Sequence, residues 1–147
     1  MKSFNKIFIL TILTLLSLPL NAKEQEESEN DFFANFIVGK YQIIGKSLDS
    51  KHAYFGIFEI KKENGELIFI KEIDGKSIHG KAHVKKTMSE STKVLRLSYH
   101  YLKQVVEETC LVSSDLDNYP RITCHLYEKD VATTSPGLEA MFIIHEE

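Results

Sequence analysis

The feature that most constrains the fold of this chain is an alternation of apolar and polar residues that runs from residue 37 almost to the C-terminus. Side chains alternate between the two faces of a β-strand, so a period of two predicts strands with one buried and one solvated face. Turn-forming residues interrupt the alternation about every 8–12 residues, as in an antiparallel barrel or sandwich. The pattern therefore predicts an all-β domain.

Eight strands are expected, joined in series by short loops. They are Ile37–Ser47, Ala53–Lys62, Leu67–Ile73, Ser77–Lys86, Lys93–Leu102, Val105–Ser113, Arg121–Lys129 and Leu138–His145. Asn64-Gly65 and Asp74-Gly75 are strong signals for two-residue hairpin turns. No connection has room for the crossover helix that parallel strands need, so the strands are antiparallel neighbours. Closing them into an up-and-down barrel removes the exposed edges, and we predict an eight-stranded, lipocalin-like antiparallel barrel.

Two of these strands are apolar on both faces. Tyr54, Phe58 and Ile60 lie on one face of Ala53–Lys62, while Phe55 and Ile57 lie on the other, and Leu67–Ile73 shows the same property. A strand of this kind needs a cover for its outer face. Phe32, Phe33 and Phe36 have helical spacing, so we expect a short N-terminal helical segment to fold over the wall or the end of the barrel. A dimer interface is the alternative cover, and the sequence leaves open whether the protein is a monomer or a dimer.

The first 22 residues have the layout of a secretory signal peptide. Lys2 and Lys6 precede an apolar stretch from Ile7 to Leu20, which is too short to span about 30 Å of hydrocarbon, and Ala22 is a small residue at the expected cleavage position. We predict a signal peptide over 1–22, an acidic lead-in with a short helix over 23–35 and a barrel domain over 36–147. The mature chain would have 147 − 22 = 125 residues, would be periplasmic or secreted, and would have no membrane span.

The two cysteines fit an exported protein, because oxidising compartments favour disulfides. In a hairpin about the loop 114–120, opposed residue numbers sum to a constant: Ser113 with Arg121 gives 234, and Cys110 with Cys124 also gives 234. Cysteines that face each other on neighbouring strands are within reach of a disulfide. Since the spacing matches neither a zinc site nor a CxxC motif, we predict a Cys110–Cys124 bridge and no metal or cofactor.

Composition and motifs exclude several function classes. The formal net charge of −3 argues against nucleic-acid binding, which normally needs a basic excess. The chain has no GxSxG elbow, HExxH or P-loop, so no enzyme activity is predicted. The histidines are expected on the solvated outer face; they are His52, His79, His83, His100, His125 and His145. Glu59 and Glu108 would have raised pKa values only if they faced inward.

The segment Val38-Gly39-Lys40-Tyr41-Gln42-Ile43-Ile44-Gly45, followed by Tyr54-Phe55-Gly56-Ile57-Phe58-Glu59-Ile60 and by Gly75 and Gly80, resembles the calycin superfamily of lipocalin-like barrels and small secreted bacterial barrel proteins. The resemblance covers roughly residues 36–83 and implies a barrel able to hold a small apolar ligand. The chain departs from the lipocalin pattern because it has no tryptophan, is shorter and lacks the C-terminal helix.

Two functions follow as hypotheses. The first is a binding protein that holds a small apolar or amphipathic ligand in the barrel, with an expected lining of Tyr41, Phe58, Phe69, Tyr99, Tyr101 and Phe142. The alternative is a ligandless surface-interaction protein that uses the basic Lys76–Lys103 region. In that case Lys81, Lys85 and Lys86 would contact an anionic surface such as lipid headgroups or polysaccharide.

Overall fold

The computed structural model describes residues 30–87, 92–114 and 116–145 of the chain. The chain divides into two units, Met1–Phe32 and Phe33–Glu147, and the second contains all eight strands. The predicted signal peptide and most of the acidic lead-in lie outside the described residues.

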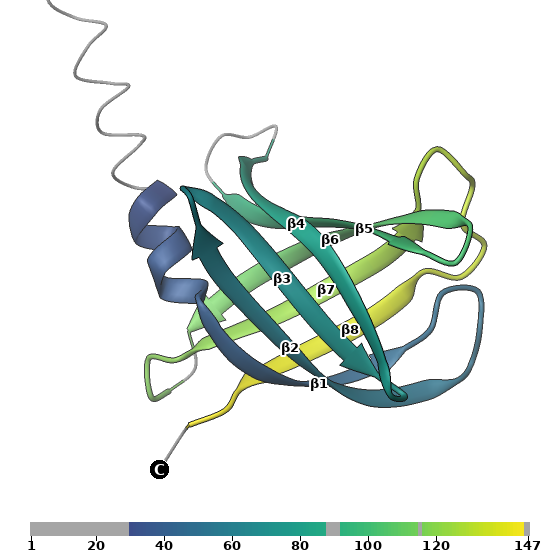
Figure 1. The fold of residues 1–147 in the computed structure, drawn as a ribbon, viewed down its shortest axis with the longest axis horizontal. Coiled ribbons are helices and arrows are strands. Elements are labelled where there is room, and N and C mark those ends of the chain that lie inside the picture. The colour runs from purple at the N-terminus through teal and green to yellow at the C-terminus, as the bar shows by residue number, and fades with distance from the viewer. Residues whose placement is uncertain (1–29, 88–91, 115, 146–147) are drawn as a thin grey trace, which may run out of the picture. The chain divides into compact units, whose positions relative to one another are not determined.

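Eight strands form one closed antiparallel barrel in which each strand pairs with its neighbours in sequence and β1 pairs with β8 (Figure 1). The strands are β1 (Gly39–Lys46), β2 (Ala53–Glu63), β3 (Glu66–Ile73), β4 (Lys76–Lys86), β5 (Lys93–Tyr101), β6 (Gln104–Ser114), β7 (Pro120–Glu128) and β8 (Gly137–Ile143). The predicted up-and-down barrel is confirmed, because its closure leaves no strand edge unpaired.

The two predicted hairpin turns are present. Asn64-Gly65 joins β2 to β3 and Asp74-Gly75 joins β3 to β4, with positive φ at all four residues. Two-residue turns of this kind match the twist of the flanking strands, and asparagine, aspartate and glycine tolerate positive φ best. The turns therefore fix the register of three consecutive strands.

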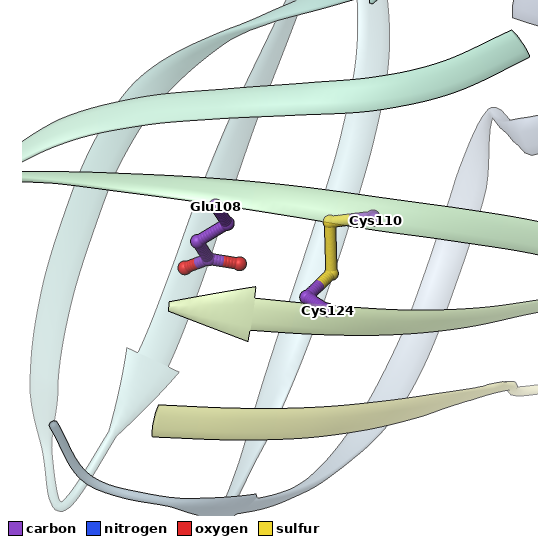
Figure 2. A group of neighbouring side chains, drawn as sticks. All are labelled: Glu108, Cys110 and Cys124. Atoms are coloured by element: carbon purple, nitrogen blue, oxygen red, sulfur yellow. A yellow bond between two sulfur atoms is a disulfide. The ribbon is translucent and has the colours of Figure 1, made fainter. Parts of the chain in front are cut away.

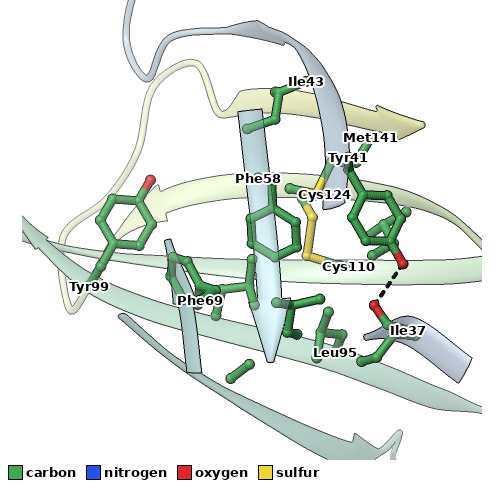
Figure 3. Packing of buried hydrophobic residues seen from close by; sticks show 14 of the residues in the cluster. Ile37, Tyr41, Ile43, Phe58, Phe69, Leu95, Tyr99, Cys110, Cys124 and Met141 are labelled. Carbon is green, nitrogen blue, oxygen red and sulfur yellow. Dashed lines mark hydrogen bonds between the residues drawn. A yellow bond between two sulfur atoms is a disulfide. The ribbon is translucent and has the colours of Figure 1, made fainter. Parts of the chain in front are cut away.

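A row of aromatic rings fills the middle of the barrel (Figure 3). Tyr41 and Phe58 have ring centroids 5.8 Å apart, Phe58 and Phe69 are 5.5 Å apart, and Phe69 and Tyr99 are 5.9 Å apart. These rings come from β1, β2, β3 and β5, and all of them lie on the inward-facing positions of the alternation. The inner faces predicted for β4 and β5 are likewise confirmed by their burial patterns.

One end of the barrel is closed by residues 33–37, the last part of the helix that precedes β1. Ala34 and Ile37 are buried in the barrel core, and Phe33 and Phe36 pack against it. The hydroxyl of Tyr41 donates a hydrogen bond to the carbonyl oxygen of Ile37 at 2.7 Å, which fixes the end of the helix to the first strand (Figure 3). Assigning Ile37 to the first strand was therefore wrong, because this residue ends the helix and β1 begins at Gly39. Among the described residues, no helix has the length and apolarity needed to cross a membrane.

The outer wall of β1 and β2 keeps apolar side chains in solvent. Phe55 is 67% exposed and its cross-strand partner Ile44 is 46% exposed. Phe33 and Phe36 pack at the core instead, so the end rather than the wall of the barrel receives the helical cover.

A disulfide joins Cys110 on β6 to Cys124 on β7, with the two Cα atoms 4.0 Å apart. The two residues are direct cross-strand partners, in the same register that pairs Ser113 with Arg121. The predicted bridge and hairpin register are both confirmed. Both cysteines are fully buried, so the bridge is part of the barrel interior.

Candidate functional site

The end of the barrel opposite the helix holds a cavity of about 220 Å³. Its walls come from the ends of the strands and from the connections that join β1 to β2 and β3 to β4. The lining residues are Ser47, Leu48, Asp49, Tyr54, Ile73, Asp74, Lys76, Ile78, Tyr99, Tyr101, Gln104, Val106 and Leu126. The lining is thus a mixture of aliphatic residues and tyrosines, with Asp49 and Asp74 contributed by a loop and a turn and Lys76 by the start of β4.

Hydrogen bonds between two loops hold part of the cavity rim. The backbone nitrogen of Asp49 donates to the carbonyl oxygen of Ser135 at 2.9 Å, and the backbone nitrogen of Ser135 donates to Oδ1 of Asp49 at 2.9 Å. Lys46 Nζ adds a hydrogen bond to the Ser135 hydroxyl at 3.2 Å. These contacts join the β1–β2 loop to the β7–β8 loop, so the rim is an ordered structure.

Three charged side chains meet inside the barrel: Lys71 from β3, Glu108 from β6 and Glu139 from β8. The Lys71 ammonium contacts Glu108 Oε1 and Glu139 Oε2, both at 2.5 Å, and the side chains of Lys71 and both glutamates are fully buried. The same ammonium lies 5.3 Å from the ring centroid of Tyr99, within the range of a cation–π contact. We refer to Lys71, Glu108 and Glu139 as the buried triad.

Tyr54 connects the cavity to the buried triad. Tyr54 is one of the residues that line the cavity, and its hydroxyl donates a hydrogen bond to Glu139 Oε1 at 2.5 Å. This bond crosses β1 at Gly45, which is the cross-strand partner of both Tyr54 and Glu139. A Cβ at position 45 would lie 2.5 Å from Cζ of Tyr54, so only glycine leaves room for the tyrosine to reach across the strand.

Burial dominates the ionisation of this region. Removal from water, followed by the charge of Glu139, raises the pKa of Glu108 to about 7, although the Lys71 ammonium opposes the shift. Burial alone would lower the pKa of Lys71, but the two carboxylates raise it overall, so Lys71 stays protonated. Burial and the neighbouring carboxylates also raise the pKa values of Tyr54 and Tyr99, which remain phenols at physiological pH.

One oxygen of the triad lacks a hydrogen bond. Glu108 Oε2 is buried and has no hydrogen-bond partner among the described residues. The Tyr99 side chain interacts with the Glu108 carboxyl group and acts to lower its pKa, which opposes the effect of burial. Because a buried unsatisfied carboxylate oxygen is costly, protonation of Glu108 is favoured.

Glu108 and the disulfide project together into the barrel (Figure 2). Within the described ranges, the two cysteine sulfurs and a Glu108 oxygen form the one grouping of potential metal ligands, with atoms within 4.8 Å of one another. Both sulfurs are bonded in the disulfide and therefore cannot act as thiolate ligands. The donor set does not fit a metal.

The residues predicted to line a ligand site are in three different environments. Tyr99 and Tyr101 line the cavity. Tyr41, Phe58 and Phe69 are buried in the packed core between the cavity and the helix, where they fill the barrel themselves. Phe142 lies on the outer wall, 37% exposed, with the Arg121 guanidinium 5.1 Å from its ring centroid.

Sequence reasoning identified Glu108 but missed its partners in the triad. It considered Glu59 and Glu108 as carboxylates that could face inward; Glu108 does, while Glu59 lies on the outer wall with its carboxylate 3.0 Å from Lys61. The alternation of strand faces could have identified Lys71 and Glu139 as inward-facing residues. Lys71 lies on the same face of β3 as Phe69, and Glu139 lies on the same face of β8 as Met141. On β3 both faces are rich in apolar residues, so the alternation alone did not indicate which face was internal.

The basic region between Lys76 and Lys103 lies largely beside acidic neighbours. Lys81 pairs with Glu66 at 2.9 Å, and Arg96 pairs with Glu107 at 2.9 Å. Lys85 and Lys86 are exposed at the end of β4. The histidines are also exposed, as predicted: His52, His79, His83, His100, His125 and His145. With part of this charge balanced locally, the region offers weaker support for a function than the cavity does.

A scan against protein-family models found no match, and searches of curated proteins and of solved structures found none either.

Proposed function

We propose that this protein is an exported binding protein that holds a small amphipathic ligand in the cavity at the open end of its barrel. The observation that carries the proposal is the division of the interior into two halves. Toward the helix, the barrel is filled by its own side chains, whereas the other end retains about 220 Å³ beneath an ordered rim. A small concave site with apolar walls and a few convergent polar groups is the usual form of a ligand site.

The dimensions and lining indicate what kind of ligand would fit. Sites for drug-sized molecules occupy about 300–1,000 Å³, so this cavity fits a smaller molecule or one end of a longer one. Ile73, Ile78, Val106 and Leu126 supply apolar walls, while the tyrosines supply hydroxyl groups. An amphipathic molecule would use both kinds of surface, and a purely apolar ligand would leave the hydroxyl groups unused.

Export agrees with the chemistry of the interior. A buried disulfide between neighbouring strands is typical of proteins that fold in an oxidising compartment. We propose the periplasm or the extracellular space as the site of action, in line with the predicted signal peptide. The calycin resemblance and the absence of enzyme activity remain predictions from sequence motifs.

The first test is native mass spectrometry of the protein purified from its source organism. We expect a small molecule to copurify with the wild-type protein. Val106→Phe should remove it, because Val106 is buried against the cavity and the larger ring would fill that space. Leu111→Phe is the matched control, since Leu111 lies on the same strand but is 57% exposed on the outer wall.

The two variants make the outcome decisive. A bound mass that is lost in Val106→Phe and retained in Leu111→Phe would support the cavity as the site. A mass that survives in both variants would place the ligand elsewhere and contradict the proposal. A wild-type protein that carries no ligand, and whose melting temperature is unchanged by fatty acids, alcohols and amines of short chain length, would also overturn it.

A further inference from the structure

The hydrogen bond from Tyr54 to the buried triad determines what this side chain can offer to a ligand. A phenol has one hydrogen to donate and two lone pairs that accept. The hydrogen of Tyr54 is directed to Glu139 Oε1 at 2.5 Å, inside the protein. Burial and the charge of Glu139 keep the phenol protonated, so this arrangement persists at physiological pH. A group that reaches the Tyr54 oxygen from the cavity must therefore act as a donor.

The charges of the buried triad and of the cavity rim also favour a ligand with a donor group. The buried triad has a formal charge of −1 when both carboxylates are ionised, and of zero when Glu108 is protonated. Glu108 Oε2 accepts no hydrogen bond from the described residues, and Tyr99, whose ring centroid lies 5.3 Å from the Lys71 ammonium, lines the cavity. At the rim, Asp49 and Asp74 outnumber the one cationic lining residue, Lys76. An anionic head group would lie near two rim carboxylates and near a buried triad whose net charge is zero or negative.

From this arrangement we infer that the cavity selects ligands whose polar end is a hydrogen-bond donor, such as an alcohol or a primary ammonium group, and discriminates against carboxylates and acceptor-only groups. The inference rests on the proposed function, because it specifies the chemistry of the ligand in the same cavity. The physical basis is the lone pairs of the Tyr54 oxygen. A ligand without a donor would displace water from this oxygen and would supply no hydrogen bond for it to accept, which costs binding free energy.

The test uses four probes with matched short chains: 1-hexanol, methyl pentyl ether, hexylammonium and hexanoate. Hexanol and methyl pentyl ether are isomers, so they differ in the donor and not in composition or charge. Each is titrated into the wild-type protein at pH 7, and backbone and side-chain amide shifts of cavity residues such as Gln104 and Val106 are followed by NMR. We expect hexanol to bind about five- to tenfold more tightly than the ether, and hexanoate to bind most weakly.

A pair of tyrosine variants locates the effect. Tyr54→Phe removes the acceptor from the cavity and should bring hexanol and methyl pentyl ether to within about twofold of each other. Tyr41→Phe is the matched control, because it also removes one buried tyrosine hydrogen bond, but this bond reaches Ile37 at the closed end of the barrel. The control should keep the wild-type preference. The comparison of the two isomers in the wild type stands alone if Tyr54→Phe does not fold.

The outcomes separate this inference from the proposed function. Equal binding of all four probes in the cavity, or tightest binding of hexanoate, would overturn donor selection and leave the binding function intact. A hexanol preference that persists in Tyr54→Phe would also overturn the assignment to Tyr54. If no probe shifts the cavity residues, the proposed function itself fails and the inference fails with it.

Discussion

At the scale of single residues, the central feature is a lysine placed where an apolar side chain would be expected. Lys71 is fully buried, and its ammonium lies between two carboxylates and the rings of Phe58, Phe69 and Tyr99. Transfer of these charges from water is costly, and mutual contact offsets the cost only while all the partners are present. The triad therefore makes the interior sensitive to the loss of any one member.

Lys71→Met tests this dependence on the full triad. The substitution keeps an unbranched side chain but leaves Glu108 and Glu139 buried without a cation. We expect the free energy of unfolding at pH 7 to fall by about 3–5 kcal/mol, as for other buried pairs that lose one partner. Urea denaturation measures the change. Lys61→Met is the control, because the Lys61 side chain is 48% exposed and its ion pair with Glu59 lies on the outer wall, where such pairs contribute about 0–1 kcal/mol. Similar losses in both variants would contradict the structural role of the triad.

Glu108 gives the stability a defined pH dependence. Its pKa is about 7 in the folded protein and 4.5 as an ordinary glutamate, so the folded state holds this proton over a range in which the unfolded state has lost it. The stability that comes from the protonated carboxyl is fully present below pH 4.5 and is lost as the pH rises to about 7. Glu108→Gln removes the titration. The wild type should therefore lose roughly 3 kcal/mol of its free energy of unfolding between pH 4.5 and pH 8 that the Glu108→Gln variant does not lose.

Urea denaturation of both proteins across this pH range provides the measurement. Glu59→Gln removes a carboxylate of the same type from the solvated outer wall and reports the background. The titratable groups that interact with Glu108 are Lys71, Glu139 and Tyr99, with Tyr54 acting through its charge interaction, and all of them remain in the Glu108→Gln variant. A stability difference between Glu108→Gln and the wild type that does not change with pH would show that Glu108 is ionised equally in the folded and unfolded states.

At the scale of secondary-structure elements, the hairpin of β6 and β7 holds the only cross-link in the described part of the chain. The bridge closes a short segment, with the two cysteines 14 positions apart. Glu108 is two residues before Cys110 on the same face of β6, so the covalent link also restrains the strand that carries one member of the triad. The β6–β7 hairpin thus carries both the disulfide that stabilises the fold and one residue of the buried triad.

Replacing both cysteines tests the contribution of this link. Cys110→Ala together with Cys124→Ala should lower the free energy of unfolding by about 3 kcal/mol, because the unfolded chain regains the entropy of the closed loop. Leu111→Ala together with Thr123→Ala is the matched control: these two residues are the adjacent cross-strand pair and are not covalently joined. A reducing agent should destabilise the wild type and the control but not the double cysteine variant. A wild type that is insensitive to reductant would contradict the bridge.

At the scale of the whole molecule, the two ends of the barrel differ in structure: one end is packed and the other holds the cavity. Residues 33–37 close one end and complete the core, whereas the loops at the other end surround the cavity. The packed aromatic row from Tyr41 to Tyr99 lies between them. The interior of a small barrel can be filled by its own side chains or can hold one small ligand, and this barrel combines both arrangements.

Ile37→Ala tests whether the packing at the closed end affects binding in the cavity. Ile37 is fully buried at the closed end, so its truncation should cost about 2–4 kcal/mol of stability through the cavity that it leaves. Binding of 1-hexanol at the opposite end should change by less than about twofold, as measured by NMR titration. Val38→Ala is the control, since Val38 is 38% exposed and should affect neither property strongly. A large loss of hexanol affinity in Ile37→Ala would show that the two ends are coupled.

The sequence by itself determined the strands, their order and the disulfide. Alternation with a period of two, the Asn64-Gly65 and Asp74-Gly75 turns and the spacing of the cysteines are local signals, and local geometry is enough to interpret them. The sequence did not determine the exact start of β1, because Ile37 fits both a helix that ends in the core and a strand that begins there.

Only the tertiary structure determined the site. Lys71, Glu108 and Glu139 come from three strands that are far apart in sequence, and each is a charged residue that would ordinarily face water. Closure of the barrel brings them together, and Gly45 leaves the gap through which Tyr54 reaches Glu139. The pairing of buried charges depends on where the strands meet in three dimensions, and no local pattern of residues encodes that position.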